Sequence, residues 1–137
     1  MSPADAPPLP SEDVQTYPRP PDLEPVPQTL RVVLGGMVVA ETRRGWRVCE
    51  THHAPTYYFP PEDVVARTLS PAKGGSHCEW KGRAVYWDVT GGGEVRPRSA
   101  WSYPEPTPRF AAIANHVAFY PGAMDACSVG DARVTPQ

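Results

Sequence analysis

The sequence predicts a mainly β domain built from antiparallel sheet, with one or two short helices. Three observations lead to this prediction. Short runs rich in β-branched and aromatic residues recur along the chain, Gly or Pro separates them at short intervals, and two glycines join the clearest pair of runs. The chain has 137 residues, which suits one domain with a core large enough to be stable alone.

The N-terminal segment differs in composition from the rest of the chain. Residues 1–28 contain nine of the 19 prolines, and five acidic residues against the single basic residue Arg19. A segment with so few apolar side chains cannot offset the entropy lost on folding. We therefore predict an acidic, proline-rich, disordered arm over residues 1–28 and a single β-rich domain over residues 29–137.

The folded part is expected to begin with a hairpin. Leu30–Leu34 and Met37–Glu41 are joined by Gly35-Gly36, and a loop of two glycines is a strong signal for a tight turn. The further strand candidates are Trp46–Glu50, Thr56–Phe59, Ala66–Leu69, Arg83–Thr90, Glu94–Arg98 and His116–Tyr120. Pro61–Val65 and Pro108–Ala114 each open with proline, and they are expected to form short helical turns.

Side-chain alternation sorts two of these strands into faces. Arg83–Thr90 carries apolar or aromatic bulk on both faces, as expected if one face packs and the other lines a cleft. In the last strand candidate, Val117 and Phe119 are expected to pack, while His116 and Tyr120 point the opposite way.

Three residues are candidates for catalysis. Cys78 lies three residues before Lys81, and a nearby ammonium group favours the thiolate that a cysteine nucleophile requires. A half-buried cysteine beside a solvated lysine is the alternative. Lys81 precedes Gly82, which permits close approach of an anionic or carbonyl ligand. Strand alternation turns Glu50 inward, where it needs a partner such as Lys81 and serves either as a general base or as a structural buried pair.

Aromatic residues from three segments are candidates for a ligand pocket. Aromatic side chains that carry a polar group are common in pockets and equally common in the cores of small domains, so both roles stay open. The residues assigned to ligand binding are Tyr58, Tyr86, Trp101, Tyr103 and His116.

Composition and motifs argue against several classes of function. The formal net charge is −2, and the acidic excess lies in the arm, so nucleic acid is not an expected partner. The sequence shows neither a membrane-spanning run nor a signal peptide, and its three widely spaced cysteines fit free thiols in the cytoplasm. It contains no Cys-x-x-Cys pair and no phosphate-binding loop, so we expect no metal and no cofactor.

From Leu30 to Tyr120 the sequence resembles the domain of unknown function 427 (DUF427) family of small bacterial proteins. The motifs that carry the resemblance are Glu50-Thr51, Tyr57-Tyr58, Cys78-x-x-Lys81-Gly82, Tyr86-Trp87, Ala100-Trp101-x-Tyr103 and Ala118-Phe119-Tyr120. The resemblance implies a fold similar to the β-tent group, with two antiparallel sheets meeting at an angle around an open cavity. Zinc-binding relatives in that group use paired Cys-x-x-Cys motifs, which this sequence lacks.

The same family carries the label nucleotidyltransferase-like, and the residues permit a chemical check. Polymerase-type nucleotidyltransferases follow a Gly-Ser turn with paired acids that hold magnesium. Here Gly75-Ser76 is followed by His-Cys-Glu-Trp, without an Asp-x-Asp pair. The residues therefore do not support that label.

Three hypotheses of function follow from the sequence. The leading one is a cytoplasmic β domain that binds a small planar or anionic molecule in a cavity holding Glu50, Lys81 and aromatic side chains, with a transferase or hydrolase activity left open. The second is an enzyme with Cys78 as nucleophile and His77 or His116 as base. The third is an adaptor that recruits partners through the proline-rich arm.

Overall fold

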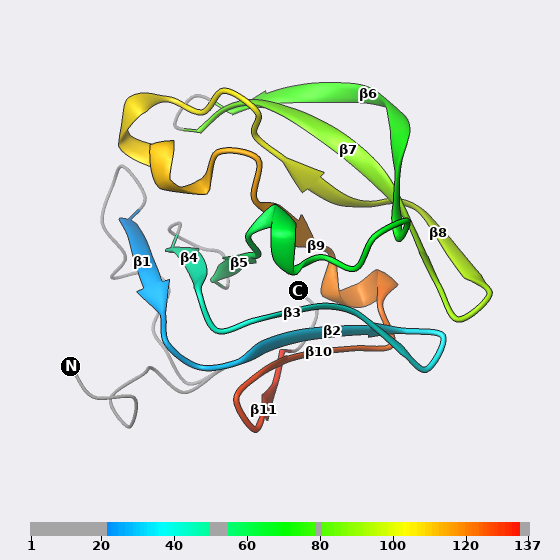
Figure 1. Cartoon of the computed structure of the whole chain (residues 1–137). Helices are drawn as coiled ribbons and strands as arrows, with labels where there is room; N and C mark the ends of the chain where they lie inside the picture. Colours follow the sequence, from blue (N-terminus) through cyan, green and yellow to red (C-terminus); the bar gives the residue numbers. More distant parts are fainter. Residues whose placement is uncertain (1–21, 50–54, 79–80, 135–137) are drawn as a thin grey trace.

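The computed structural model describes residues 22–49, 55–78 and 81–134, and within them the chain is mainly β (Figure 1). The strands of these residues form three antiparallel sheets. This confirms the predicted fold class, and it corrects the expected number of sheets from two to three. The third sheet arises because the chain leaves the first hairpin at Arg43 and Arg44 and pairs next with an N-terminal strand.

Sheets A, B and C are named here by their strands in spatial order. Sheet A contains β1 (Asp22–Val26), β4 (Gly45–Cys49) and β5 (Thr56–Tyr58). Sheet B contains β11 (Ala132–Arg133), β10 (Ala126–Val129), β2 (Leu30–Leu34) and β3 (Met37–Thr42). Sheet C contains β6 (Leu69–Cys78), β7 (Gly82–Gly91), β8 (Glu94–Ser102) and β9 (Val117–Phe119).

Three short 3-10 helices connect these strands in the described part of the chain. They are η3 (Pro61–Asp63), η4 (Pro108–Ile113) and η5 (Pro121–Ala123), and each has proline in its first turn. The first two confirm the expected helical turns at slightly shorter lengths. No helix in the described residues has the length and apolar character needed to cross a membrane.

Strand β1 corrects the predicted boundary of the arm. Residues 22–26 were assigned to the arm, but they pair with β4, and Glu24 lies opposite Arg47 with a 2.7 Å ion pair. Val26 packs in the core. The proline-rich composition did not predict this strand, because proline removes a backbone N–H donor. Pro25 is tolerated here because β1 is an edge strand, where a missing N–H breaks no pairing. Residues 1–21 lie outside the described part of the chain.

Strand β6 corrects a second prediction. The candidate strand Ala66–Leu69 is mostly a turn, and Leu69 instead begins a strand that continues through Pro71 and Gly74. In the sequence, Pro71 and Gly74 were interpreted as residues that separate one strand from the next. They are accommodated because β6 is an edge strand whose register shifts between Pro71 and Gly75. Strands β10 and β11 had no counterpart among the predicted strands.

Two hairpin turns hold sheets B and C against each other. Gly35 and Gly36 have φ angles of 61° and 76°, as a two-residue type I′ turn requires, which confirms the predicted hairpin. Gly92 and Gly93 form the corresponding turn between β7 and β8. A Cβ atom on Gly92 would lie 1.9 Å from the carbonyl oxygen of Gly35, so the close contact of the two turns requires glycine.

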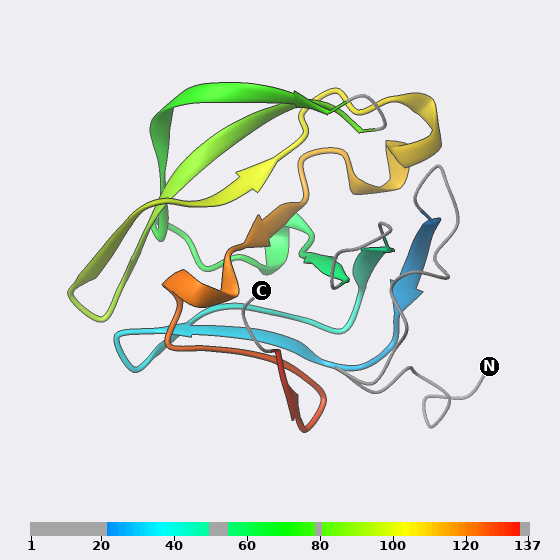
Figure 2. The ribbon, with the colours of Figure 1, turned by 180° about the vertical axis from the view of Figure 1, so that it is seen from behind.

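The segment after β5 joins all three sheets. Phe59 and Val117 exchange two backbone hydrogen bonds of 2.8 Å, which connect sheet A to sheet C. The N–H of Val65 then donates to the carbonyl of Val39 in sheet B. Figure 2 shows the result from behind, with sheets B and C facing each other and the segment from β9 to η5 between them.

The buried apolar residues of the described segments form two clusters. The first core lies between sheets B and C and includes Leu30, Val32, Leu34, Val39, Phe59, Val89, Val117 and Phe119. The second core includes Val48, Tyr58, Ala84, Tyr103, Phe110, Ile113 and Ala118. Sheet C therefore buries side chains on both faces. The predicted phase of β9 is confirmed, because Val117 and Phe119 are buried while Tyr120 is 43% exposed.

Candidate functional site

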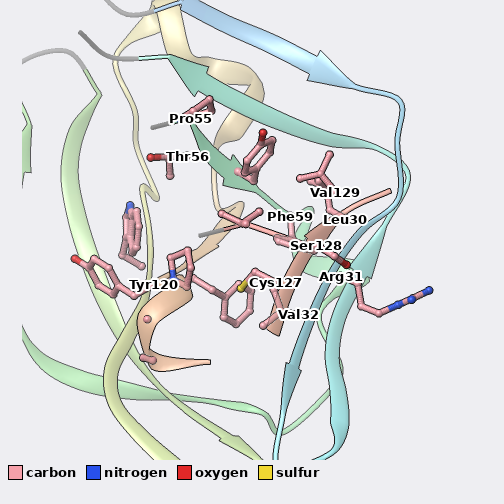
Figure 3. A pocket seen from close by; sticks show the side chains of 17 residues that line it. Leu30, Arg31, Val32, Pro55, Thr56, Phe59, Tyr120, Cys127, Ser128 and Val129 are labelled. Atoms are coloured by element: carbon pink, nitrogen blue, oxygen red, sulfur yellow. The ribbon is translucent and has the colours of Figure 1, made fainter. Parts of the chain in front are cut away.

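A pocket of about 490 Å³ opens beside the first core, and we call it the main pocket (Figure 3). Its walls come from β2, β10, β5 with its flanking residues, and the segment from β9 to η5. These elements belong to all three sheets, so the pocket forms only when the whole domain is folded. Its volume lies in the range of about 300–1,000 Å³ that is usual for small-molecule sites.

The floor of the main pocket is apolar and belongs to the first core. Leu30, Val32 and Phe119 line it and are almost completely buried. Phe59 meets Phe119 edge to face, with ring centres 5.5 Å apart. Because these side chains also pack against one another in the first core, the floor of the pocket is well ordered.

Aromatic side chains form one wall. The ring centres of Trp101 and Tyr120 are 4.4 Å apart and the rings are tilted by 41°. Trp101 is only partly buried, and Tyr57 of β5 also lines the pocket. Trp101 and Tyr120 together give this wall aromatic surface against which an aromatic or other planar molecule could pack.

Tyr86 and Arg98 both interact with Tyr120 of this wall. The guanidinium carbon of Arg98 lies 4.1 Å from the centre of the Tyr86 ring. Burial raises the pKa of Tyr120 above 10, and the charge and hydrogen bond of Tyr86 raise it further, while Arg98 lowers it. The Tyr120 hydroxyl therefore keeps its proton at neutral pH and remains a hydrogen-bond donor.

The thiol of Cys127 lines the main pocket and is a poor nucleophile. Burial raises its pKa to about 11, and the charge of Arg133 offsets only part of the effect. At pH 7 a thiol with this pKa is ionised in about one molecule in ten thousand. The thiol of Cys127 therefore acts as a small apolar group in the wall.

Polar groups are few in the main pocket. Thr56 and Ser128 contribute hydroxyl groups, and Arg31 is the one charged residue among the described residues of the lining. Arg31 is paired with Glu41, and Figure 3 shows its side chain pointing away from the pocket. Among the described residues, no carboxylate or histidine lines the main pocket.

The structure locates one of the three predicted catalytic side chains. Lys81 is 5% exposed, and its Nζ atom lies 5.5 Å from the centre of the Tyr103 ring, at one end of the second core. Cys78 is the last residue of β6, but its side chain lies outside the described residues, as does all of Glu50. Lys81 does not line the main pocket.

The predicted ligand-binding residues divide between the pocket and the second core. Trp101 lines the main pocket, whereas Tyr58 and Tyr103 are buried in the second core, with ring centres 6.4 Å apart. Tyr86 of β7 is paired with Trp101 of β8 and is not among the described lining residues of the main pocket. His116 is half-buried, and its Nδ1 atom is 3.1 Å from the carbonyl oxygen of Ala114.

Several lining residues were missed by the sequence interpretation. Tyr120 had a usable signal, because alternation in its strand turns it away from the core. Cys127 and Ser128 had none, because β10 is a four-residue strand without a recognisable pattern. Thr56 begins the predicted strand β5, but nothing in its residue type marked it as a pocket residue. Within the described residues there is no cluster of three or more His, Cys, Asp or Glu side chains that could hold a metal ion.

A sequence profile of the family described as a domain of unknown function (DUF427) matches residues 22–130. The match starts at the first residue of β1 and includes every described strand except β11. It confirms the resemblance carried by the motifs between Leu30 and Tyr120. No functionally curated protein matches the chain.

Proposed function

We propose that this chain, which belongs to the DUF427 family, binds a small molecule with a flat apolar body in the main pocket. The observation that carries the proposal is the combination of a volume of about 490 Å³ with an apolar floor and the Trp101–Tyr120 wall. Such a surface gains free energy mainly by removing apolar area of the ligand from water. In this proposal the protein acts in the cytoplasm.

The polar groups at the edge of the main pocket would orient the bound molecule. Thr56 and Ser128 each contribute a hydroxyl group to the lining. A ligand with one or two hydrogen-bonding atoms on a planar frame would match these groups, because each hydroxyl can donate or accept. The proposal is therefore an aromatic or heteroaromatic molecule rather than a flexible lipid chain.

Binding rather than covalent catalysis is the function that the lining of the main pocket supports. Its thiol is protonated at neutral pH, and its hydroxyl groups have no carboxylate or histidine beside them in the described lining. The hypothesis of catalysis by Cys78 stays a prediction, which a measurement of the thiol pKa of Cys78 would test.

The test compares the same substitution at two alanines, one inside the main pocket and one outside it. Ala123 lines the main pocket in η5, whereas Ala112 is exposed in η4. We expect 2-naphthol and quinoline to bind the wild-type protein in calorimetric titrations. We also expect Ala123→Phe to abolish binding because the new ring fills the pocket, and Ala112→Phe to leave it unchanged.

Two results would overturn the proposal. The first is equal binding of the probes by Ala123→Phe and by the wild-type protein, since the ligand would then lie elsewhere. The second is absence of probe binding at millimolar concentration together with absence of any bound mass in native mass spectrometry of the protein from its own host.

A further inference from the structure

A second pocket of about 340 Å³ lies between the η3–β6 connection and sheet C. None of its lining residues belongs to the main pocket. Its apolar wall includes Val64, Leu69, Val85 and Trp87, so it offers a surface to a small apolar group. Because the two pockets share no residue, a ligand in one makes no direct contact with the wall of the other.

The polar groups of the second pocket are mainly hydrogen-bond donors. The indole Nε1 of Trp87 donates to the Ser102 hydroxyl at 2.7 Å, which leaves the hydroxyl proton of Ser102 free to donate in turn. Asn115 contributes a carboxamide at the exposed edge, and Arg67 contributes a guanidinium group. Arg67 is the one charged residue of the described lining, and no carboxylate is present to neutralise it.

The backbone of Arg67 is in an unfavourable conformation. Its φ angle is 69°, in the left-handed region that favours glycine or asparagine. The turn that imposes this angle is closed by Thr68, whose N–H and hydroxyl both donate to the carbonyl oxygen of Val65. A glycine at position 67 would satisfy the same turn without strain, so the turn does not explain an arginine there.

The other residues with the same backbone conformation have a local explanation. Arg98 has a φ angle of 47°, but its guanidinium stacks on Tyr86 and also donates to the carbonyl of Lys73. Asn115, with a φ angle of 60°, is a residue type that tolerates this region. Within the described residues, Arg67 has no hydrogen bond or ion pair through its side chain. Its guanidinium group is therefore available at the edge of the second pocket.

We propose that the second pocket binds a small organic carboxylate, with its apolar body against Trp87 and its carboxylate held by Arg67. A guanidinium group matches a carboxylate with two parallel N–H donors, and the Asn115 amide offers a further donor. This site is independent of the function proposed for the main pocket, and either proposal can fail without the other.

The test uses benzoate as the probe and benzamide as its neutral counterpart. In two-dimensional NMR of the full chain, benzoate should shift the indole N–H of Trp87 and the side-chain amide of Asn115, and should bind about tenfold more tightly than benzamide. Arg67→Gln should weaken benzoate binding about tenfold and remove the preference over benzamide. Arg43→Gln, which removes an exposed arginine outside the pocket, should change neither.

A glycine variant separates a ligand site from a plain turn. Arg67→Gly should raise the melting temperature because it relieves the backbone strain, and it should also remove the preference for benzoate. Ala123→Phe in the main pocket should leave benzoate binding unchanged. Absence of shifts at Trp87 and Asn115 with millimolar benzoate, or wild-type benzoate affinity in both Arg67 variants, would overturn the proposal.

Discussion

The main pocket and the second core have similar aromatic content, yet one is hollow and the other is filled. The second core contains Tyr58 and Tyr103, and η4 adds the large side chains of Phe110 and Ile113, both fully buried. Beside the main pocket lies another short helix, η5, which contributes the small residues Gly122 and Ala123 to the lining. The difference in side-chain volume on these two helices explains why a cavity persists beside one cluster of aromatic residues and not beside the other.

Two tyrosines adjacent in sequence show the same contrast. Tyr57 and Tyr58 lie next to each other in β5 and therefore point to opposite faces of sheet A. Tyr57 lines the main pocket, while Tyr58 is completely buried in the second core. Aromatic residues in one motif can thus have different roles, and the deciding factor is what packs opposite each face.

The largest expected effect is the loss of the side chain that fills the second core. Phe110→Ala should lower the free energy of unfolding by about 3–5 kcal/mol, because it leaves a cavity in a fully buried site. Urea denaturation measures this change, with Val95→Ala as a control because Val95 is 55% exposed. A loss below about 1 kcal/mol would mean that the second core is not tightly packed.

The next effect concerns the thiol in the main pocket and its dependence on pH. The pKa of Cys127 is raised to about 11 in the folded protein. Between about pH 9 and pH 11 the unfolded chain therefore binds fewer protons than the folded chain, and stability falls as pH rises. The loss should approach about 2–3 kcal/mol at most.

The contribution of Cys127 can be isolated by subtraction, since other groups titrate in the same range. Chemical denaturation of the wild-type protein and of Cys127→Ala from pH 7 to pH 11 gives the difference. The difference in stability between the two proteins should shrink as pH rises. A constant difference would show that Cys127 has an ordinary thiol pKa and is exposed to water.

Lys81 tests whether the second core has a structural or a functional role. Lys81→Ala should lower the free energy of unfolding by about 2 kcal/mol, because it removes a buried stem and the contact of the ammonium group with Tyr103. Lys73→Ala, on the exposed surface of β6, should have little effect. Thermal melting measures both variants, and an unchanged melting temperature for Lys81→Ala would favour the functional role.

The smallest effect concerns Trp101, which contacts both regions. It meets Tyr58 edge to face at 6.4 Å and Tyr120 at 4.4 Å. Trp101→Phe should lower stability by only about 1 kcal/mol, because the smaller ring keeps part of each contact. Binding of 2-naphthol should fall several-fold in a calorimetric titration. Equal affinity in the variant would place the probe away from the aromatic wall.

Local chemistry allowed much of the fold to be predicted from the sequence. The Gly35-Gly36 hairpin and the prolines that begin η3 and η4 act through nearby residues, so both were found. Strands β1 and β6 were misassigned because their prolines are tolerated only at a sheet edge, and which strand lies at an edge is a property of the whole fold.

The site was less predictable than the fold for a similar physical reason. Trp101 was assigned to ligand binding and lines the main pocket, but Tyr58 and Tyr103 have the same residue chemistry and are buried in the second core. Composition and alternation place side chains on faces, whereas a cavity depends on the volume of residues that come from distant segments. The strain at Arg67 was invisible in the sequence, because only coordinates give a φ angle.

The most direct test of this account is a crystal structure of the full chain grown with 2-naphthol. We expect density for the probe in the main pocket, in contact with Trp101, Tyr120 and Ala123, and none within the second core. A main pocket closed by rearranged side chains, or a probe bound among Tyr58, Tyr103 and Phe110, would contradict the account.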